Sequence, residues 1–218
     1  MSSFDFSEIF ENFSELLKER FSEQKKLGKT EYRVEEDTIR YFFFYAVTTS
    51  GYYKATDFWL EGHFYDNKNA ELDTFINPKN EEKSIAIEFK YNRLNNEKSD
   101  GAKTDNAGNI FRDLNRLAHL GKKAQRKLFV YVANDVMKEY FSNKQSLWCK
   151  TLGTIPLEKD KSLNISHKNV NSLKSKSGCR TYFKNAEGDS FDRDFTVSCV
   201  FEKQIGEKEF LYIYEILN

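Results

Sequence analysis

The segment from Lys127 to Ala133, KLFVYVA, limits the possible folds more than any other part of the chain. It is a continuous apolar run, as expected for a β-strand that is buried on both faces. Segments with helical periodicity precede it in the chain. We therefore expect an α/β fold in which a central mixed β-sheet is flanked by helices.

Apolar residues that recur every three or four positions predict helices, and short apolar runs bounded by turn residues predict strands. The expected helices span 6–21, 33–48 and 106–120. The expected strands span 63–65, 72–76, 84–91 and 127–133, followed by an antiparallel hairpin over 195–201 and 209–217. The central order is thus helix, three strands, helix and strand.

The organisation of the chain predicts a single domain over residues 1–218. Its core covers about 31–142, with an N-terminal helical extension over 1–30 and a C-terminal extension over 143–218. Within the latter, the stretch from Leu157 to Lys184 carries seven Lys and Arg against two Asp and Glu. It is either a mobile basic loop or a recognition insert.

The composition excludes several classes of protein. A mean hydropathy of -0.72 argues against a membrane protein, and 16% aromatic residues argue against a disordered chain. Lys and Arg number 34, as do Asp and Glu, so a nucleic-acid surface requires segregated charge. Three cysteines without a CxxC pair and a start that lacks a signal peptide favour a reducing cytoplasm over export.

Several well-known site motifs do not occur. Gly28-Lys29-Thr30 resembles the end of a phosphate-binding loop, but residue 23, where the first glycine should stand, is glutamate. The sequence contains no GxGxxG, GxSxG or HExxH motif, and its three histidines are far apart. Nucleotide-binding loops, nucleophile elbows and zincin-type metal sites are therefore not expected.

The most informative segment is the strand Ile85–Tyr91, IAIEFKY. Side chains alternate along a strand, so Glu88 and Lys90 project from the same face as Ala86. E-x-K spacing is common, but this copy lies among apolar strand residues. A charge pair that violates the local pattern in this way tends to mark a site.

The turn residues of Asn77–Lys83 predict a hairpin between this strand and Leu72–Ile76. If Asn77 pairs with Ser84, then Asp73 stands opposite Glu88 on the same face. Two facing carboxylates destabilise a bare sheet by up to about 1 kcal/mol. A divalent cation such as Mg²⁺ relieves that repulsion and retains waters that phosphate oxygens can replace.

These residues resemble the PD-(D/E)XK nuclease superfamily, which has the restriction-endonuclease-like fold. The resemblance covers Glu35 to Ala133 and rests on Leu72-Asp73, then Glu88-Phe89-Lys90, with Leu72 in place of the motif's proline. It implies that Asp73 and Glu88 bind Mg²⁺, with Mn²⁺ as a substitute, and that Lys90 is catalytic. It also implies an acidic residue on the first core helix, which is Glu36 or, as the competitor, Glu35.

The helix after the motif also resembles this superfamily. Asn109, Arg112 and Arg116 fall roughly opposite its apolar stripe, where they could contact a phosphate backbone. The alternative is a solvated face in which Asp113 and Arg116 form an ordinary ion pair. A further hypothesis brings His63 into the site.

The resulting functional hypothesis is a Mg²⁺-dependent nuclease that hydrolyses phosphodiester bonds, with double-stranded DNA as substrate and a restriction or defence role. The substrate and the role are implied by the resemblance, because no residue distinguishes DNA from RNA. The alternative is a nucleic-acid-binding or assembly module that keeps the fold without cleaving. A homodimer remains open, and no membrane partner is expected.

Overall fold

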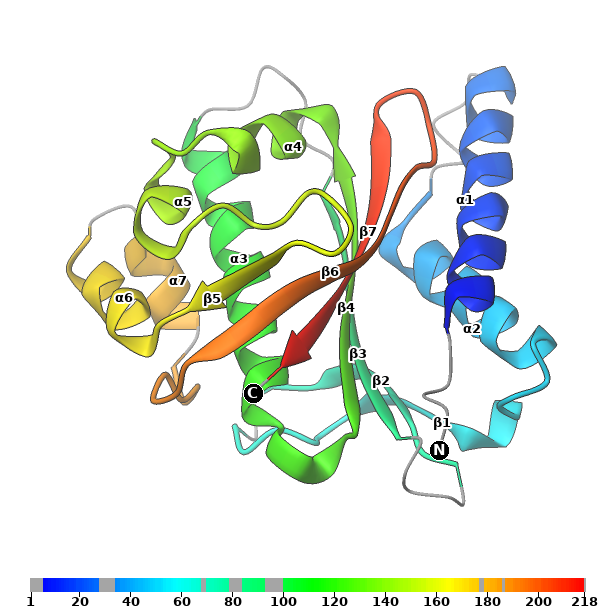
Figure 1. Cartoon of the computed structure of the whole chain (residues 1–218), viewed down its shortest axis with the longest axis horizontal. Helices are drawn as coiled ribbons and strands as arrows, with labels where there is room; N and C mark the ends of the chain where they lie inside the picture. Colours follow the sequence, from blue (N-terminus) through cyan, green and yellow to red (C-terminus); the bar gives the residue numbers. More distant parts are fainter. Residues whose placement is uncertain are drawn as a thin grey trace.

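The computed structural model describes residues 6–27, 34–67, 70–78, 84–92, 100–176, 179–185 and 187–217. Its seven strands form one sheet in the order β1-β2-β3-β4-β7-β6-β5 (Figure 1). The strands are β1 Phe58–Gly62, β2 Leu72–Ile76, β3 Ile85–Asn92, β4 Arg126–Asn134, β5 Ser162–Ile165, β6 Phe195–Gln204 and β7 Glu209–Leu217. The α-helices are α1 Ser7–Leu27, α2 Glu36–Thr49, α3 Asp100–His119, α4 Asp135–Ser142, α5 Leu147–Leu152, α6 His167–Ser172 and α7 Arg180–Asn185. Short 3₁₀ turns are η2 Ala55–Asp57, η4 Gly121–Lys123 and η5 Leu173–Ser175.

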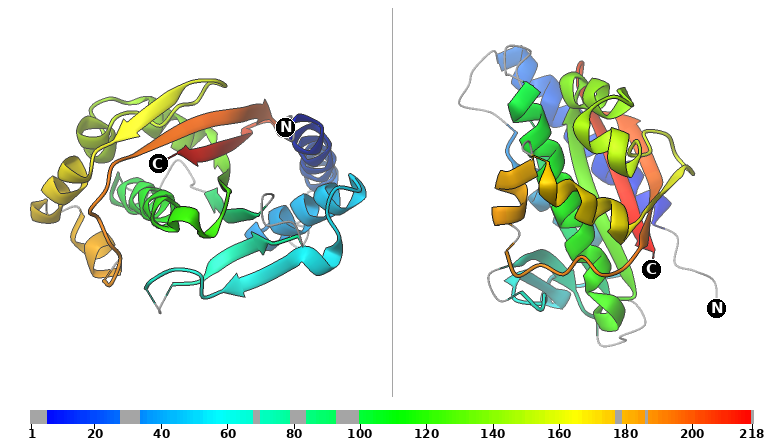
Figure 2. Two further views of the ribbon diagram at one scale, coloured as in Figure 1. Left: turned by 60° about the horizontal axis from the view of Figure 1, so that its bottom comes forward. Right: turned by 90° about the vertical axis from the view of Figure 1, so that its left-hand side faces the viewer.

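The sheet is mixed and has helices on both faces. β3 and β4 are parallel and are connected through α3, whereas the other described strand pairs are antiparallel. α1 and α2 cover one face, and α3 with the shorter helices covers the other (Figures 1 and 2). Figure 2 also shows β6 and β5 curving around α3. The expected α/β fold with a helix-flanked mixed sheet is confirmed.

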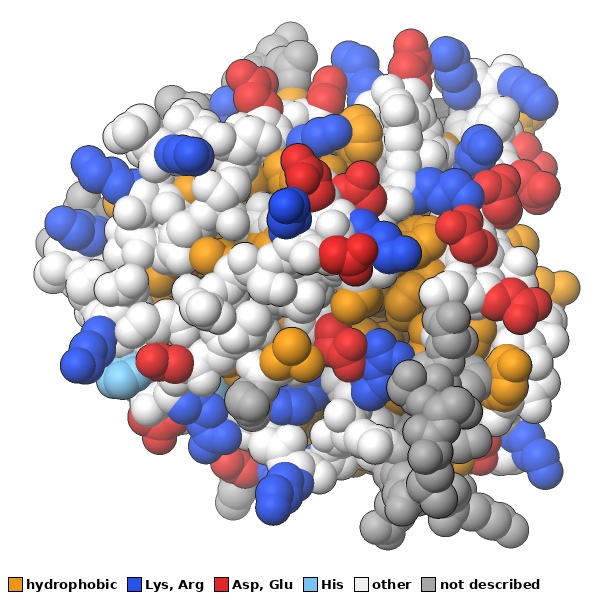
Figure 3. Space-filling view, viewed as in Figure 1, with side chains coloured by type: hydrophobic (Ala, Val, Ile, Leu, Met, Phe, Trp, Pro, Cys, Tyr) orange, Lys and Arg blue, Asp and Glu red, His pale blue; other side chains and the backbone are white. Residues whose placement is uncertain are grey.

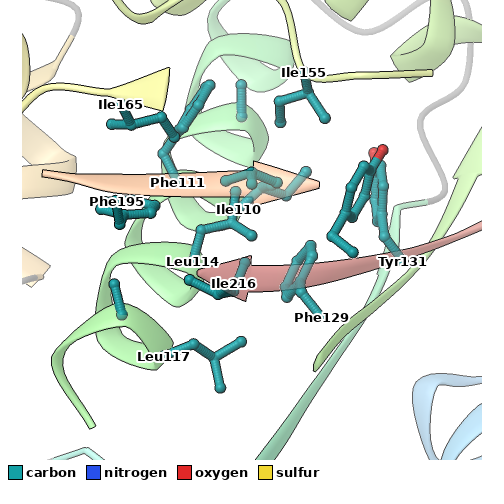
Figure 4. Packing of buried hydrophobic residues seen from close by; sticks show 14 of the residues in the cluster. Ile110, Phe111, Leu114, Leu117, Phe129, Tyr131, Ile155, Ile165, Phe195 and Ile216 are labelled. Carbon is teal, nitrogen blue, oxygen red and sulfur yellow. The ribbon is translucent and has the colours of Figure 1, made fainter. Parts of the chain in front are cut away.

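β4 is buried on both faces, as its apolar sequence predicts. Leu128 and Val130 pack in the cluster beneath α1 and α2, whereas Phe129 and Tyr131 pack in the cluster around α3. Figure 4 shows the second cluster, where side chains of α3, β4 and the C-terminal strands meet. The flanking strands share this alternation, so the sheet separates two apolar cores.

The N-terminal helices form one of these cores. In α1 the apolar stripe faces α2, where the rings of Phe13 and Phe43 meet at 5.3 Å between centroids. Phe43 in turn contacts Phe89 of β3, with 5.5 Å between ring centroids. α2 begins with a capping box in which Glu35 and Thr38 satisfy each other's backbone N–H groups. This cap fixes the start of α2 beside β3.

The first strand is not where the sequence predicts it. We expected a strand at His63–Tyr65, but β1 is Phe58–Gly62, and residues 63–65 leave the sheet. β1 is an edge strand with mostly exposed side chains, so it lacks the apolar alternation that identifies a strand. Glu61 has φ +54°, and this left-handed residue lies just before the chain leaves the sheet.

The basic segment from Leu157 to Lys184 is folded rather than a mobile loop over its described residues. It contains β5, α6, η5 and α7, and α7 packs against α3. α4 and α5 were also not predicted, because elements of six to eight residues are too short for a clear periodic signal. In the hairpin between β2 and β3, residues 79–83 lie outside the described part of the chain.

Two further expectations concern membrane spans and cysteines. In the described residues, every helix is too short or too polar to cross a bilayer. Cys149, Cys179 and Cys199 are buried as free thiols, which agrees with the expected lack of a disulfide framework.

Candidate active site

The candidate site lies where β2 and β3 stop pairing. The register is the expected one, with Thr74 opposite Ile87 and Ile76 opposite Ile85. Two residues further along β3, the Phe89 N–H donates to Asp73 Oδ2 at 2.7 Å instead of to a strand carbonyl. The next N–H on the same edge, that of Tyr91, donates to Glu36 Oε2 at 3.0 Å. The carboxylates of Asp73 and Glu36 thus accept hydrogen bonds from two backbone N–H groups on the edge of β3, at the point where its pairing with β2 ends.

Glu88 is the buried centre of this site. Its residue is 6% exposed, and its Oε1 accepts a 2.5 Å hydrogen bond from the Tyr65 hydroxyl. Burial, together with the nearby carboxylates of Asp73 and Asp113, raises the pKa of Glu88 well above its usual value. Ionisation of Glu88 in this position therefore costs free energy.

Asp73 lies beside Glu88 and faces a cation on its other side. Arg40 Nη2 donates to Asp73 Oδ1 at 2.9 Å, and Arg40 Nη1 donates to Glu61 Oε1 at 3.1 Å. Burial alone would lower the pKa of the Arg40 guanidinium, but the charge of Asp73 and the other carboxylates raises it overall. Arg40 thus partly compensates the charge of Asp73. Glu88 forms no ion pair among the described residues, although its charge contributes to the raised pKa of Arg116.

Lys90 is paired with Glu36, not with Glu88. Its Nζ lies 3.3 Å from Glu36 Oε2, the oxygen that also accepts the Tyr91 N–H. Burial would lower the pKa of Lys90, but Glu36, then Asp113, raises it overall. Glu35, the competing helix acid, is exposed at the helix N-cap. The structure therefore brings Glu36, rather than Glu35, to the site.

Asp113 on α3 completes the acidic cluster. It is 6% exposed, and burial raises its pKa despite the opposing charge of Arg112. Arg112 Nε lies 3.4 Å from its Oδ1. Asp113 interacts electrostatically with Glu88 and Lys90, so α3 forms one wall of the site.

The expected phosphate-contacting face of α3 is mostly covered. The side chains of Arg112 and Arg116 are 19% and 14% exposed, and Asn109 is partly buried. Arg116 Nε binds Asp189 Oδ2 at 2.8 Å, in place of the Asp113 pair that the sequence suggested. The chain around Asp189 packs over this side of the helix, so the arginines do not form the freely solvated face of the alternative, and their phosphate contact stays a prediction.

His63 does not join the site. Its side chain is 64% exposed, and its Nε2 lies 3.4 Å from Glu71 Oε1. Two residues later, Tyr65 is 8% exposed and reaches Glu88 instead. The turn out of β1 therefore brings a tyrosine to the site where the sequence reasoning considered a histidine.

The carboxylates of Asp73 and Glu88 are suited to a hard cation that takes few of its ligands from the protein. Among the described residues, no group of three or more His, Cys, Asp or Glu side chains is arranged to hold a metal ion. Asp73 and Glu88 are the paired carboxylates, and Mg²⁺ is commonly held by one or two carboxylates with water and phosphate oxygens completing its shell. The burial of Glu88 without a close ion pair in the described residues also fits a cation at this position, because a bound cation would favour the ionised carboxylate.

Sequence reasoning missed three residues of the site: Arg40, Tyr65 and Asp113. Arg40 lies one helical turn after Glu36 on α2, so its position follows once that acid is assigned. Asp113 interrupts the apolar stripe of α3 as a buried charge. No sequence pattern indicates that Tyr65 belongs to the site, because its position depends on the turn after β1.

Comparisons with models of protein families, with curated proteins and with solved structures found no match for this chain.

Proposed function

We propose that this chain is a metal-dependent nuclease that hydrolyses phosphodiester bonds, with Asp73, Glu88 and Lys90 as its central site residues. The order helix, three strands, helix, strand in α2 to β4 supports a restriction-endonuclease-like fold. The resemblance to the PD-(D/E)XK superfamily extends the proposal to DNA as substrate, a cytoplasmic location and a restriction or defence role.

The observation that carries the proposal is the position of two carboxylates and a lysine at the end of the β2–β3 ladder. The Asp73 carboxylate accepts a hydrogen bond from the backbone N–H of Phe89, the residue between Glu88 and Lys90. The Asp73 side chain therefore lies next to the part of β3 that carries Glu88 and Lys90. This arrangement combines a buried carboxylate of raised pKa with an adjacent cation, as functional sites often do.

Each residue has a chemical role in this reaction. Asp73 and Glu88 would hold Mg²⁺, which, when bound, lowers the pKa of water and offsets phosphate charge. Lys90 orients the attacking water or balances charge on the phosphate in the transition state. Glu36 holds the Lys90 ammonium by its ion pair, and Arg40 fixes the carboxylate of Asp73.

A second candidate is a binding module that retains the fold without cleaving. It is favoured by the hydrogen bonds that occupy the two carboxylates: Asp73 accepts from Arg40 and from the Phe89 N–H, and Glu88 accepts from Tyr65. In such a module these bonds would be purely structural. The carboxylates of Asp73 and Glu88 would then bind no cation.

Calorimetric titration with Mg²⁺ and Mn²⁺ separates the two candidates. For a nuclease we expect saturable binding by the wild type that is lost in Asp73→Asn and retained in Glu139→Gln, a control at an exposed acid of α4. No binding by the wild type, or equal binding by Asp73→Asn, would contradict the nuclease proposal.

A further inference from the structure

The segment 143–185 differs in charge from the rest of the chain. It contains nine Lys and Arg residues against two Asp and Glu residues, although the whole chain is neutral. The part from Ser162 to Asn185 contains no acidic residue. A neutral protein therefore concentrates positive charge in one folded segment.

The lysines of this segment are available to a partner. Eight of them are exposed, and none forms an ion pair within the described part of the chain: Lys144, Lys150, Lys159, Lys161, Lys168, Lys174, Lys176 and Lys184. Elsewhere, exposed lysines such as Lys25 and Lys123 bind carboxylates at 2.8 and 2.9 Å. Figure 3 shows Lys and Arg side chains along the left-hand margin, on the side of α6 and α7.

The helices of the segment 143–185 pack closely against α3. Trp148 of α5 contacts Tyr182 of α7 with 4.8 Å between ring centroids, and both rings lie against Gly108 of α3. A Cβ at Gly108 would come within 2.9 Å of Trp148, so the two helices approach α3 closely at this glycine. Lys174 Nζ lies 5.5 Å from the centroid of the Phe191 ring, which limits its freedom.

The packing of α7 against α3 also connects the segment 143–185 to the candidate active site. Tyr182 of α7 lies against Gly108 of α3, and Asp113, further along the same helix, belongs to the acidic cluster around Glu88. A polyanion on α7 would therefore lie against the helix that forms one wall of the site.

The chemistry of the segment favours nucleic acid over a lipid surface. Peripheral membrane helices insert large apolar side chains, but the large exposed hydrophobic residues of the described chain all lie outside 143–185. Around the lysines stand amides and hydroxyls, including Asn164, Asn169 and Ser172. Lys, Asn and Ser side chains are donors to phosphate oxygens and base edges.

We propose that the surface formed by Lys168, Lys174, Lys176 and Lys184 binds the phosphodiester backbone of double-stranded DNA and presents it to the α3 wall of the active site. This inference rests on the proposed function. It assigns the phosphate contacts to α6, η5 and α7 instead of to Arg112 and Arg116, which are covered and paired with acids.

The test compares binding of a fluorescent DNA duplex in EDTA, where no cleavage occurs, by three proteins. One is the wild type, and the second has all four lysines of this surface replaced by glutamine. The third is a control of equal net charge with Lys18, Lys26, Lys54 and Lys122, which are exposed elsewhere, replaced by glutamine. Anionic phosphatidylserine vesicles are the competing polyanion.

We expect the four-lysine variant to lose on the order of a hundredfold in affinity, with a salt slope of log K lower by about 3 to 4 than in the wild type. The control should bind DNA like the wild type, and vesicles should bind none of the proteins. Equal binding by the variant and the wild type, equal losses in variant and control, or tight wild-type binding to vesicles would overturn the inference. The same wild type is also assayed for cleavage with Mg²⁺. If it cleaves DNA there while the four-lysine variant binds normally in EDTA, this surface is refuted but the nuclease proposal stays intact. A wild type that neither binds nor cleaves would refute both.

Discussion

Replacing Glu88 by glutamine is expected to stabilise the metal-free protein at neutral pH. The substitution keeps the shape of the side chain and its acceptor for the Tyr65 hydroxyl, and it removes a charge that is buried beside Asp73. Because the pKa of Glu88 is higher in the folded protein than in the unfolded chain, its protonated form stabilises the fold at low pH. That contribution is lost as the pH rises through the folded pKa.

The magnitude follows from the linkage between pKa and stability. Each unit by which the folded pKa exceeds the unfolded one costs the ionised protein about 1.4 kcal/mol. For a chain of this size that corresponds to about 3 to 6 °C in Tm per unit. Glu88→Gln should therefore melt several degrees above the wild type at pH 8, and the difference should vanish near pH 4, where both side chains are neutral.

Thermal denaturation in EDTA from pH 4 to pH 8 measures this difference, with Glu139→Gln as the exposed control. Adding Mg²⁺ should then raise the Tm of the wild type and leave Glu88→Gln unchanged, because a ligand that binds the folded state stabilises it. A Glu88→Gln protein that is less stable than the wild type at pH 8 would refute the reasoning that ionisation of this buried carboxylate destabilises the fold.

Three further substitutions test the other residues. Lys90→Ala should lower single-turnover cleavage on the order of a hundredfold with little loss of stability, since its partly exposed ion pair contributes about 0 to 1 kcal/mol; normal cleavage would remove Lys90 from the chemistry. Tyr65→Phe should cost about 1 to 3 kcal/mol in a denaturant melt by leaving a buried carboxylate oxygen without its donor, and an unchanged melt would contradict that bond. Asp189→Asn should cost about 3 kcal/mol, because Arg116 loses its buried partner. If Asp189→Asn instead keeps full stability and binds DNA more tightly, Arg116 is a phosphate contact after all.

The centre of the fold could be predicted because its patterns are local. β2, β3 and β4 have apolar runs bounded by turn residues, and their observed limits differ by at most one residue from the expected ones. The register of the β2–β3 hairpin follows from pairing Asn77 with Ser84, and the observed pairs from Thr74–Ile87 to Ile76–Ile85 have that register, in which Asp73 is the next residue opposite Glu88. Both depend on residues close together in sequence.

What could not be predicted depends on distant contacts. Tyr65 reaches Glu88 because the chain turns away after Glu61, and the covering of Arg116 depends on Asp189, which lies 73 residues further along the chain. The folded basic segment has short elements stabilised by aromatic contacts to α3, such as that of Tyr182 with Trp148. Periodicity carries no signal for such contacts.

The most direct test of the nuclease proposal is metal-dependent DNA cleavage measured under single-turnover conditions. We expect the wild type and Glu139→Gln to cleave duplex DNA with Mg²⁺ or Mn²⁺ and not in EDTA. Asp73→Asn and Glu88→Gln should fold and still bind DNA but should not cleave it. Cleavage by either of these two variants at the wild-type rate, or no cleavage by the wild type with either metal, would contradict the nuclease proposal.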